Sequence, residues 1–117
     1  TATEISDEYI ESAKRVAKAN KAGVKIVKSD LFKGIKGRFD WVIFNPPFRN
    51  REDSDGYKII ERLLEEAPKN TKLMIVSNAF YADLKRIEDA IKENDYSIIE
   101  IVAGFLNPSK VYVVKKD

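Results

Sequence analysis

The sequence predicts a single α/β domain of 117 residues, built on a largely parallel sheet that helices cover on both faces. Three observations predict it. Short apolar segments alternate with segments of helical spacing, two of the apolar segments are unbroken like buried strands, and the last two lie close enough to form an antiparallel pair. The expected strands are residues 1–5, 24–27, 41–44, 73–76, 98–102 and 111–114.

Amphipathic spacing predicts three helices between these strands. Ser6 or Asp7 caps the first helix. The second helix covers residues 57–67 and ends at Pro68, which cannot continue a helix. The third has one apolar side, made of Leu84, Ile87, Ala90 and Ile91. The expected order is therefore strand, helix, strand, strand, helix, strand, helix, strand, strand.

The composition narrows the possible functions. The 21 basic and 19 acidic residues leave a net charge of +2, too small for a global field that would attract polyanions. The chain has no cysteine and no histidine, which removes thiolate nucleophiles and the commonest metal ligand, so no metal site is expected. No apolar run approaches membrane-spanning length and no signal peptide is visible. We therefore expect a cytoplasmic protein with no membrane partner.

The segment Asn45-Pro46-Pro47-Phe48 directly follows the apolar strand 41–44. Neither proline donates a backbone hydrogen bond, and each restricts the residue before it, so Asn45 is expected to be extended at the carboxyl end of the strand. Ligands bind at that edge in open α/β sheets. An amide oxygen beside an aromatic ring suits a flat substrate that bears an amino group.

This motif resembles that of the amino-methylating class I methyltransferases, which use S-adenosylmethionine and include adenine-N6, ribosomal RNA guanine-N2 and release-factor glutamine enzymes. The resemblance covers essentially the whole chain. It implies a Rossmann-like sheet that ends in an antiparallel hairpin, with S-adenosylmethionine as the cofactor. Glu4 matches the acidic residue that ends the family's second strand, and Asp30 matches the one that follows its third strand. That match assigns Glu4 to the cofactor ribose, Ile5 to the adenine face, Asp30 to the adenine amino group, and Leu31 to a place beside the ring.

The chemistry supports this resemblance independently. An arylamine or carboxamide nitrogen is a poor nucleophile because its lone pair is delocalised. Acceptors against both N–H bonds favour the nucleophilic geometry, and we expect the Asn45 side-chain oxygen and the Pro46 carbonyl to be these acceptors, with Asn45 also beside the cofactor. Pro47 and Phe48 are expected to bind the substrate, with the Phe48 ring stacked on it. This mechanism uses positioning and electrostatics and needs no metal.

One departure from the family is serious. The glycine-rich cofactor loop and the first strand that carries it are missing, since none of the five glycines forms a Gly-x-Gly cluster. In the family sheet that strand lies between the second and the fourth, so strands 1–5 and 24–27 are expected to be parted from strand 41–44. We interpret residues 1–117 as a single, N-terminally truncated methyltransferase domain. Alternatively, another segment supplies the strand, or the sheet closes directly and the cofactor site is lost.

Three of the assigned residues have a simpler interpretation. Glu4 precedes a helix, where an acidic residue often serves the helix dipole. Asp30 fits an ordinary turn. Phe48 fits the core, although its place after two prolines favours a surface platform.

Other side chains also leave alternatives open. Arg49 and Arg51 grip a phosphate or an acidic protein surface, or they belong to a solvated loop with the acidic residues that follow. Asn78 and Tyr81 follow the strand 73–76 at the same ligand edge, where a substrate role is an alternative for them. The residues assigned to the core are Trp41 and, with a dimer edge as the alternative, Phe105, Leu106 and Tyr112.

The leading hypothesis is an N-methyltransferase for a planar amino group, with a glutamine of a translation release factor as the substrate. The segment from Asn78 to the final hairpin resembles the archaeal enzymes of that type, and the small net charge suits a protein substrate. The resemblance then implies a small zinc-binding activator protein as a partner. Phe48 in place of tyrosine resembles the ribosomal RNA guanine-N2 enzymes, so RNA is the close alternative. A non-catalytic binding or scaffold module is the alternative from a different class.

Overall fold

The protein is described by a computed structural model that covers residues 1–48, 54–77, 82–104 and 109–117. Within these residues the elements follow the predicted order. They form two compact units, Thr1–Gly37 and Arg38–Asp117. Unit 1 contains β1 (Ala2–Glu4), α1 (Asp7–Ala19) and β2 (Ile26–Lys28). Unit 2 contains β3 (Trp41–Phe44), α2 (Ser54–Glu66), β4 (Lys72–Ser77), α3 (Leu84–Glu93), β5 (Tyr96–Ala103) and β6 (Lys110–Lys116).

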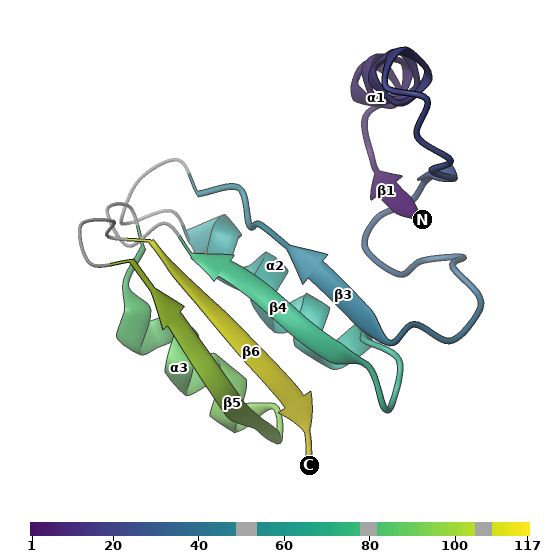
Figure 1. The fold of residues 1–117 in the computed structure, drawn as a ribbon. Helices are drawn as coiled ribbons and strands as arrows, with labels where there is room; N and C mark the ends of the chain where they lie inside the picture. Colours follow the sequence, from purple (N-terminus) through teal and green to yellow (C-terminus); the bar gives the residue numbers. More distant parts are fainter. Residues whose placement is uncertain (49–53, 78–81, 105–108) are drawn as a thin grey trace. The chain divides into compact units, whose positions relative to one another are not determined.

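The described strands form two separate sheets (Figure 1). β1 and β2 pair in parallel, and the second sheet has the order β3-β4-β6-β5. In that sheet β3 and β4 are parallel, whereas β6 is antiparallel to both β4 and β5. The predicted closing hairpin is therefore confirmed.

Unit 1 is a short parallel βαβ arrangement. The stripe of α1 that faces inward includes Ile10, which is buried. Ser6 occupies the predicted N-cap position, but its side chain makes no capping hydrogen bond. Instead one oxygen of Glu4, Oε1, accepts from the backbone N–H groups of Ile5 and Ser6 at 2.7 and 2.9 Å. Glu4 thus holds the two residues that precede α1.

The core of unit 2 lies between its sheet and the two helices behind it (Figure 1). β4 contributes Leu73 and Ile75, which are fully buried because they project toward the helices. The buried apolar residues of β6, α2 and α3 include Tyr112, Val114, Ile60, Leu63, Leu64, Ile87, Ala90 and Ile91. The predicted apolar side of the third helix is confirmed, although Leu84 is only half-buried. α2 begins at Ser54, earlier than predicted, because its apolar spacing starts only at Tyr57.

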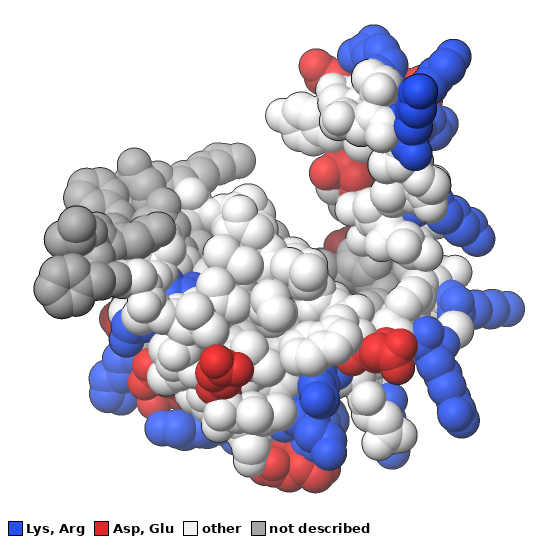
Figure 2. Space-filling view, viewed as in Figure 1, with Lys and Arg blue, Asp and Glu red and all other residues white. Residues whose placement is uncertain are grey.

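On the opposite face of this sheet, two predictions are wrong. Trp41 is 47% exposed and Ile43 is 70% exposed, so β3 is half-buried rather than a core strand, and Trp41 is not a core residue. Both described helices of unit 2 lie on the other face, and β3 is an edge strand within the described sheet (Figure 1). Figure 2 shows mostly uncharged side chains over this open face. The Lys72 ammonium lies 5.1 Å from the centre of a Trp41 ring, which gives the indole a cationic neighbour.

Candidate functional site

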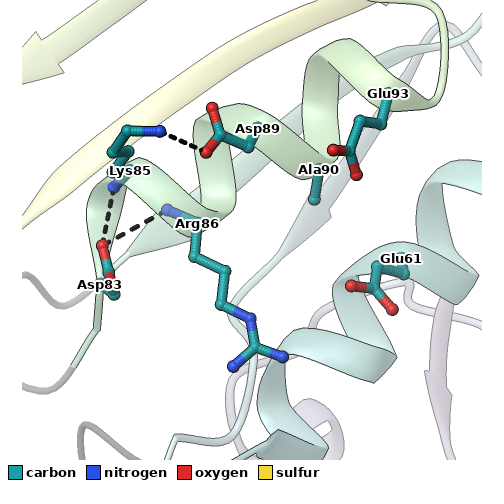
Figure 3. Close-up of a pocket in the computed structure, with 7 residues that line it drawn as sticks. All are labelled: Glu61, Asp83, Lys85, Arg86, Asp89, Ala90 and Glu93. Carbon is teal, nitrogen blue, oxygen red and sulfur yellow. Dashed lines mark hydrogen bonds and ion pairs between the residues drawn. The ribbon is translucent and has the colours of Figure 1, made fainter.

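One pocket of unit 2, of about 300 Å³, lies between α2 and α3 (Figure 3). It is lined by Glu61, Asp83, Lys85, Arg86, Asp89, Ala90 and Glu93, and it contains none of the predicted site residues. Its charges are largely engaged with the protein. Asp83 caps α3 by accepting from Lys85 and Arg86 backbone N–H groups, and Lys85 pairs with Asp89 at 2.6 Å. The pocket is therefore a charged groove between two helices. The predicted site residues lie elsewhere, at or after the ends of β1, β2 and β3.

The predicted cofactor residues Glu4, Ile5, Asp30 and Leu31 meet at one edge of unit 1. β1 and β2 run parallel with Glu4 opposite Lys28, so both strands end at this edge. The Ser29 backbone N–H donates to the Glu4 carbonyl at 2.9 Å and ties the two strand ends together. The structure therefore brings these four residues to the same edge, as the resemblance implies for a cofactor site.

The position of Glu4 is compatible with both of its interpretations, a role at the helix dipole and a role in binding the cofactor ribose. Its Oε1 accepts from the backbone N–H groups of Ile5 and Ser6 just before α1 begins, where a negative charge is favourable to the helix dipole. Its Oε2 has no hydrogen-bond partner among the described residues, so one oxygen is available to a ligand hydroxyl. Ile5 is 62% exposed beside it, which suits an apolar surface for a flat ring. The local bonds hold the carboxylate in place without using its full accepting capacity.

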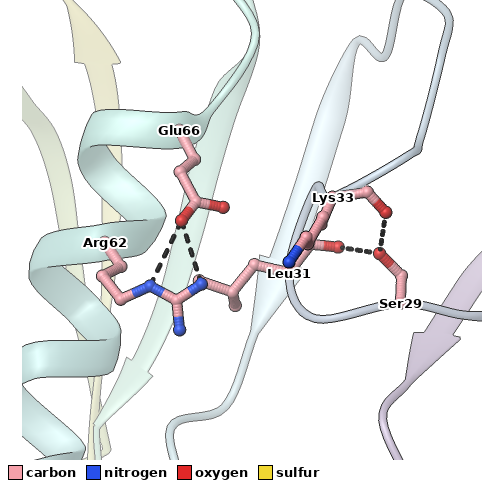
Figure 4. Close-up of polar contacts among 5 residues, drawn as sticks. All are labelled: Ser29, Leu31, Lys33, Arg62 and Glu66. Atoms are coloured by element: carbon pink, nitrogen blue, oxygen red, sulfur yellow. Dashed lines mark hydrogen bonds and ion pairs between the residues drawn. The ribbon is translucent and has the colours of Figure 1, made fainter.

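The turn at Asp30 and Leu31 has an unusual backbone. Leu31 has φ of 51°, a left-handed conformation that a bulky residue rarely adopts. The buried Ser29 hydroxyl is 2.9 Å from the Leu31 carbonyl and 2.8 Å from the Lys33 carbonyl, and it supports the turn from inside (Figure 4). The Lys33 N–H also donates to the Asp30 carbonyl at 3.0 Å. Strain of this kind clusters at ligand sites, so the geometry is consistent with a binding turn.

Asn45 begins the corner that follows β3. It is exposed, and no described residue forms a hydrogen bond with its carboxamide. Pro46 is buried, and its carbonyl accepts from the Phe48 N–H at 3.0 Å, which closes a tight turn. A carbonyl oxygen has two lone pairs, so this bond leaves Pro46 one further accepting position. The described corner thus has an amide oxygen and a carbonyl oxygen that can accept from a ligand.

Phe48 is half-buried, so the core and platform interpretations each hold in part. Its ring packs against Gly56 and lies 4.9 Å from the Tyr57 ring, with the planes tilted by 59°. Gly56 and Tyr57 were not predicted from the sequence, because they lie eight or more residues after Phe48 and no motif marks them. The one available signal was a glycine in the first turn of a helix, where it lowers helix propensity.

Several predicted residues lie outside the described residues: Arg49, Arg51, Asn78, Tyr81, Phe105 and Leu106. Tyr112 is fully buried, which confirms its core assignment. No cluster of acidic residues in the described part of the chain could hold a metal ion. None of the described helices combines the length and apolar character needed to cross a membrane.

Comparisons with known proteins show the family that the chain matches and relatives that it resembles. The family model described as "Methyltransferase small domain" matches residues 1–105. A ribosomal RNA small subunit methyltransferase C from Haemophilus influenzae (strain PittEE) is 35% identical over 121 residues, and the match covers 98% of this chain and 34% of that protein. The chain therefore spans about a third of the length of this curated relative.

Solved structures confirm the predicted Rossmann-like class I methyltransferase fold. A methyltransferase from Pyrococcus furiosus is 26% identical with a TM-score of 0.74, over 97% of this chain and 59% of that one. The ribosomal protein L11 methylase from Lactobacillus delbrueckii subsp. bulgaricus has a TM-score of 0.73 over 99% of this chain and 56% of that one. Its 21% identity makes it evidence for the fold alone.

Proposed function

Because the chain belongs to the methyltransferase small domain family, we propose that it forms part of an S-adenosylmethionine-dependent enzyme that methylates an amino group of small-subunit ribosomal RNA. Guanine N2 is the proposed acceptor, and adenine N6 is the alternative. The observation that carries the proposal is the exposed Asn45 carboxamide, which no described residue engages and which directly follows β3.

The proposed chemistry rests on two oxygen atoms at this corner. The exocyclic nitrogen of guanine is flat because its lone pair is delocalised into the ring. The Asn45 Oδ1 accepts one N–H, and the remaining lone pair of the Pro46 carbonyl accepts the other, which favours a pyramidal nitrogen. Both oxygens are acceptors that stabilise the positive charge growing on nitrogen during transfer. The cofactor supplies an electrophilic methyl group on a sulfonium.

The proposed cofactor contacts are those at the edge of unit 1. Glu4 offers Oε2 to the ribose hydroxyls while Oε1 keeps its hydrogen bonds to the Ile5 and Ser6 N–H groups. Ile5 offers its exposed side chain to the adenine face, and Asp30 and Leu31 bind the adenine amino group and ring edge. Carboxylates at the ends of parallel strands are a common way to bind a ribose. A direct contact between Asn45 and the cofactor is a further prediction.

RNA is favoured over a release factor by the relatives and by charge. The Haemophilus relative is named for small-subunit ribosomal RNA. Charge is uneven along the chain, because residues 1–37 contain eight basic and five acidic residues, whereas residues 38–117 contain thirteen and fourteen. Arg15, Lys18 and Lys21 are exposed, and within the described residues they make no ion pair. Such side chains neutralise phosphates, so the small net charge of the whole chain is no argument against RNA.

The test is a methyl-transfer assay with the protein expressed from its complete coding sequence. Radiolabelled S-adenosylmethionine is supplied with small-subunit ribosomal RNA, small ribosomal subunits or release factor, side by side. We expect label in RNA and, after digestion to nucleosides, in N2-methylguanosine. Label only in the release factor, above all if it depends on a zinc-binding activator protein, would overturn the RNA proposal in favour of glutamine methylation.

A non-catalytic scaffold is the competing proposal, and cofactor binding distinguishes the two. A ligand that binds the folded state stabilises it by about 2.7 kcal/mol at a hundredfold excess over its Kd. We therefore expect S-adenosylmethionine to raise the melting temperature of the same protein. A titration without any shift, in a protein that is folded by circular dichroism, would favour the scaffold.

A further inference from the structure

The Phe48 ring packs against Gly56 and Tyr57, a packing site that we call the seat, and only glycine leaves room for the ring at position 56. A Cβ atom built on Gly56 would be 2.5 Å from Phe48 Cδ1 and 2.7 Å from Cε1, distances that real Cβ atoms essentially never show. Gly56 is buried, so the ring and the first turn of α2 are in direct contact. Any larger side chain at position 56 must therefore move the Phe48 ring.

Tyr57 forms the second wall of this seat. Its ring is 2% exposed and lies 4.9 Å from the Phe48 ring. Its hydroxyl accepts from the Asp83 backbone N–H at 2.6 Å, and the Arg86 guanidinium carbon lies 4.1 Å from its ring centre. Figure 3 shows the Arg86 side chain extending from α3 toward α2. Tyr57 therefore connects the corner after β3 to the start of α3.

We propose that Gly56 and Tyr57 are positioning residues that set where Phe48 meets the methyl acceptor, an inference that rests on the proposed function. Phe48 follows two prolines, so its backbone is restricted, but its side chain direction depends on what it packs against. The seat fixes that direction and leaves the ring half-exposed. Transfer in line requires the acceptor nitrogen at a set distance, and misplacement by about 1 Å costs on the order of a hundredfold in rate.

A double-mutant cycle tests this inference in the protein expressed from its complete coding sequence, with small-subunit ribosomal RNA as the substrate. Phe48→Ala removes the ring, and Gly56→Ala displaces it while favouring the helix. Each single variant should lower kcat/KM for RNA by roughly tenfold to a hundredfold, the range expected when one stacked base loses its aromatic partner. In the Phe48→Ala background, Gly56→Ala should cost less than about twofold, because residues that act together are not additive.

Tyr57→Phe provides a milder second variant, and Tyr96→Phe is its matched control. Tyr96 is also buried, and its hydroxyl donates to the Leu64 carbonyl at 3.1 Å, but it belongs to β5, at the opposite edge of the described sheet from β3. Each variant loses a hydrogen bond between its hydroxyl and the backbone, so both should lose stability. Only Tyr57→Phe should lower kcat/KM for RNA, and KM for S-adenosylmethionine should stay within about twofold in both.

The outcomes separate the inference from the proposed function. If Phe48→Ala lowers activity while Gly56→Ala and Tyr57→Phe do not, or if the cycle is additive, the positioning inference is wrong and the function stands. If neither the wild-type protein nor any variant methylates RNA, the proposed function fails. NMR of selectively labelled phenylalanine still tests whether Gly56 and Tyr57 position the Phe48 ring. The Phe48 ring signals should shift in Gly56→Ala and Tyr57→Phe but not in Tyr96→Phe. Unchanged Phe48 ring signals would overturn the inference even if no methyl transfer can be detected.

Discussion

Replacement of Asn45 by alanine should separate catalysis from stability more cleanly than any other substitution in the described chain. Asn45 is exposed and no described residue hydrogen-bonds its carboxamide, so its removal leaves no buried polar group unpaired. Exposed substitutions of this kind change the free energy of unfolding by less than about 0.5 kcal/mol. Loss of one oriented acceptor from a transition state costs about 10²–10³ in kcat, or about 2.7–4 kcal/mol.

The assay measures both quantities in the protein expressed from its complete coding sequence. Methyl transfer to small-subunit ribosomal RNA gives kcat and KM, and urea unfolding gives the stability. We expect kcat to fall by about 10²–10³ with KM nearly unchanged, since the acceptor acts mainly in the transition state. The urea midpoint should not move.

Asn94→Ala is the matched control. The Asn94 amide donates to the Ala90 carbonyl at 2.9 Å at the end of α3, so its loss should cost about 1 kcal/mol of stability. The activity of the folded fraction should be unchanged, because Asn94 lies away from the corner after β3. Wild-type kcat in Asn45→Ala would refute the acceptor mechanism. A loss of activity in Asn45→Ala that merely parallels a loss of stability would refute it equally.

Three further predictions follow from other contacts. Glu4→Gln keeps an oxygen for the Ile5 and Ser6 N–H groups but loses the charge, so KM for S-adenosylmethionine should rise by about tenfold at unchanged stability. Glu4→Ala removes that oxygen as well, so it should also lose about 0.5–2 kcal/mol of stability. Burial, aided by the hydrogen bond to Glu88, raises the pKa of Tyr112 above its usual value near 10. The folded state thus holds its proton more tightly than the unfolded state. Stability is full below about pH 10 and should fall by up to about 1.4 kcal/mol per pH unit above it, with a shallower slope in Tyr112→Phe by urea unfolding. Ile75→Ala, at a fully buried position of β4, should cost about 2–5 kcal/mol, measured as a lower urea midpoint.

The amino-acid sequence was sufficient for the order of the elements, because apolar spacing is a local property of the chain. The bounds of β3 match the predicted strand, and the buried side of α3 contains three of the four predicted residues. The start of α1 was predicted correctly, whereas the start of α2 was not, since its first turn precedes the apolar spacing and is marked only by Asp55, which favours the helix dipole. As the resemblance predicts, Glu4 ends β1, and Asp30 follows the end of β2.

Tertiary structure alone decided which surfaces of these elements are covered. Trp41 and Ile43 read as core residues in the sequence, yet both are exposed because burial depends on which strand or helix packs against that face. The surroundings of Phe48 likewise come from Gly56, Tyr57 and Asp83, which are brought together only when α2 and α3 pack on the sheet. Periodicity specifies which side chains share a face, and only the non-local packing of elements specifies what that face contacts.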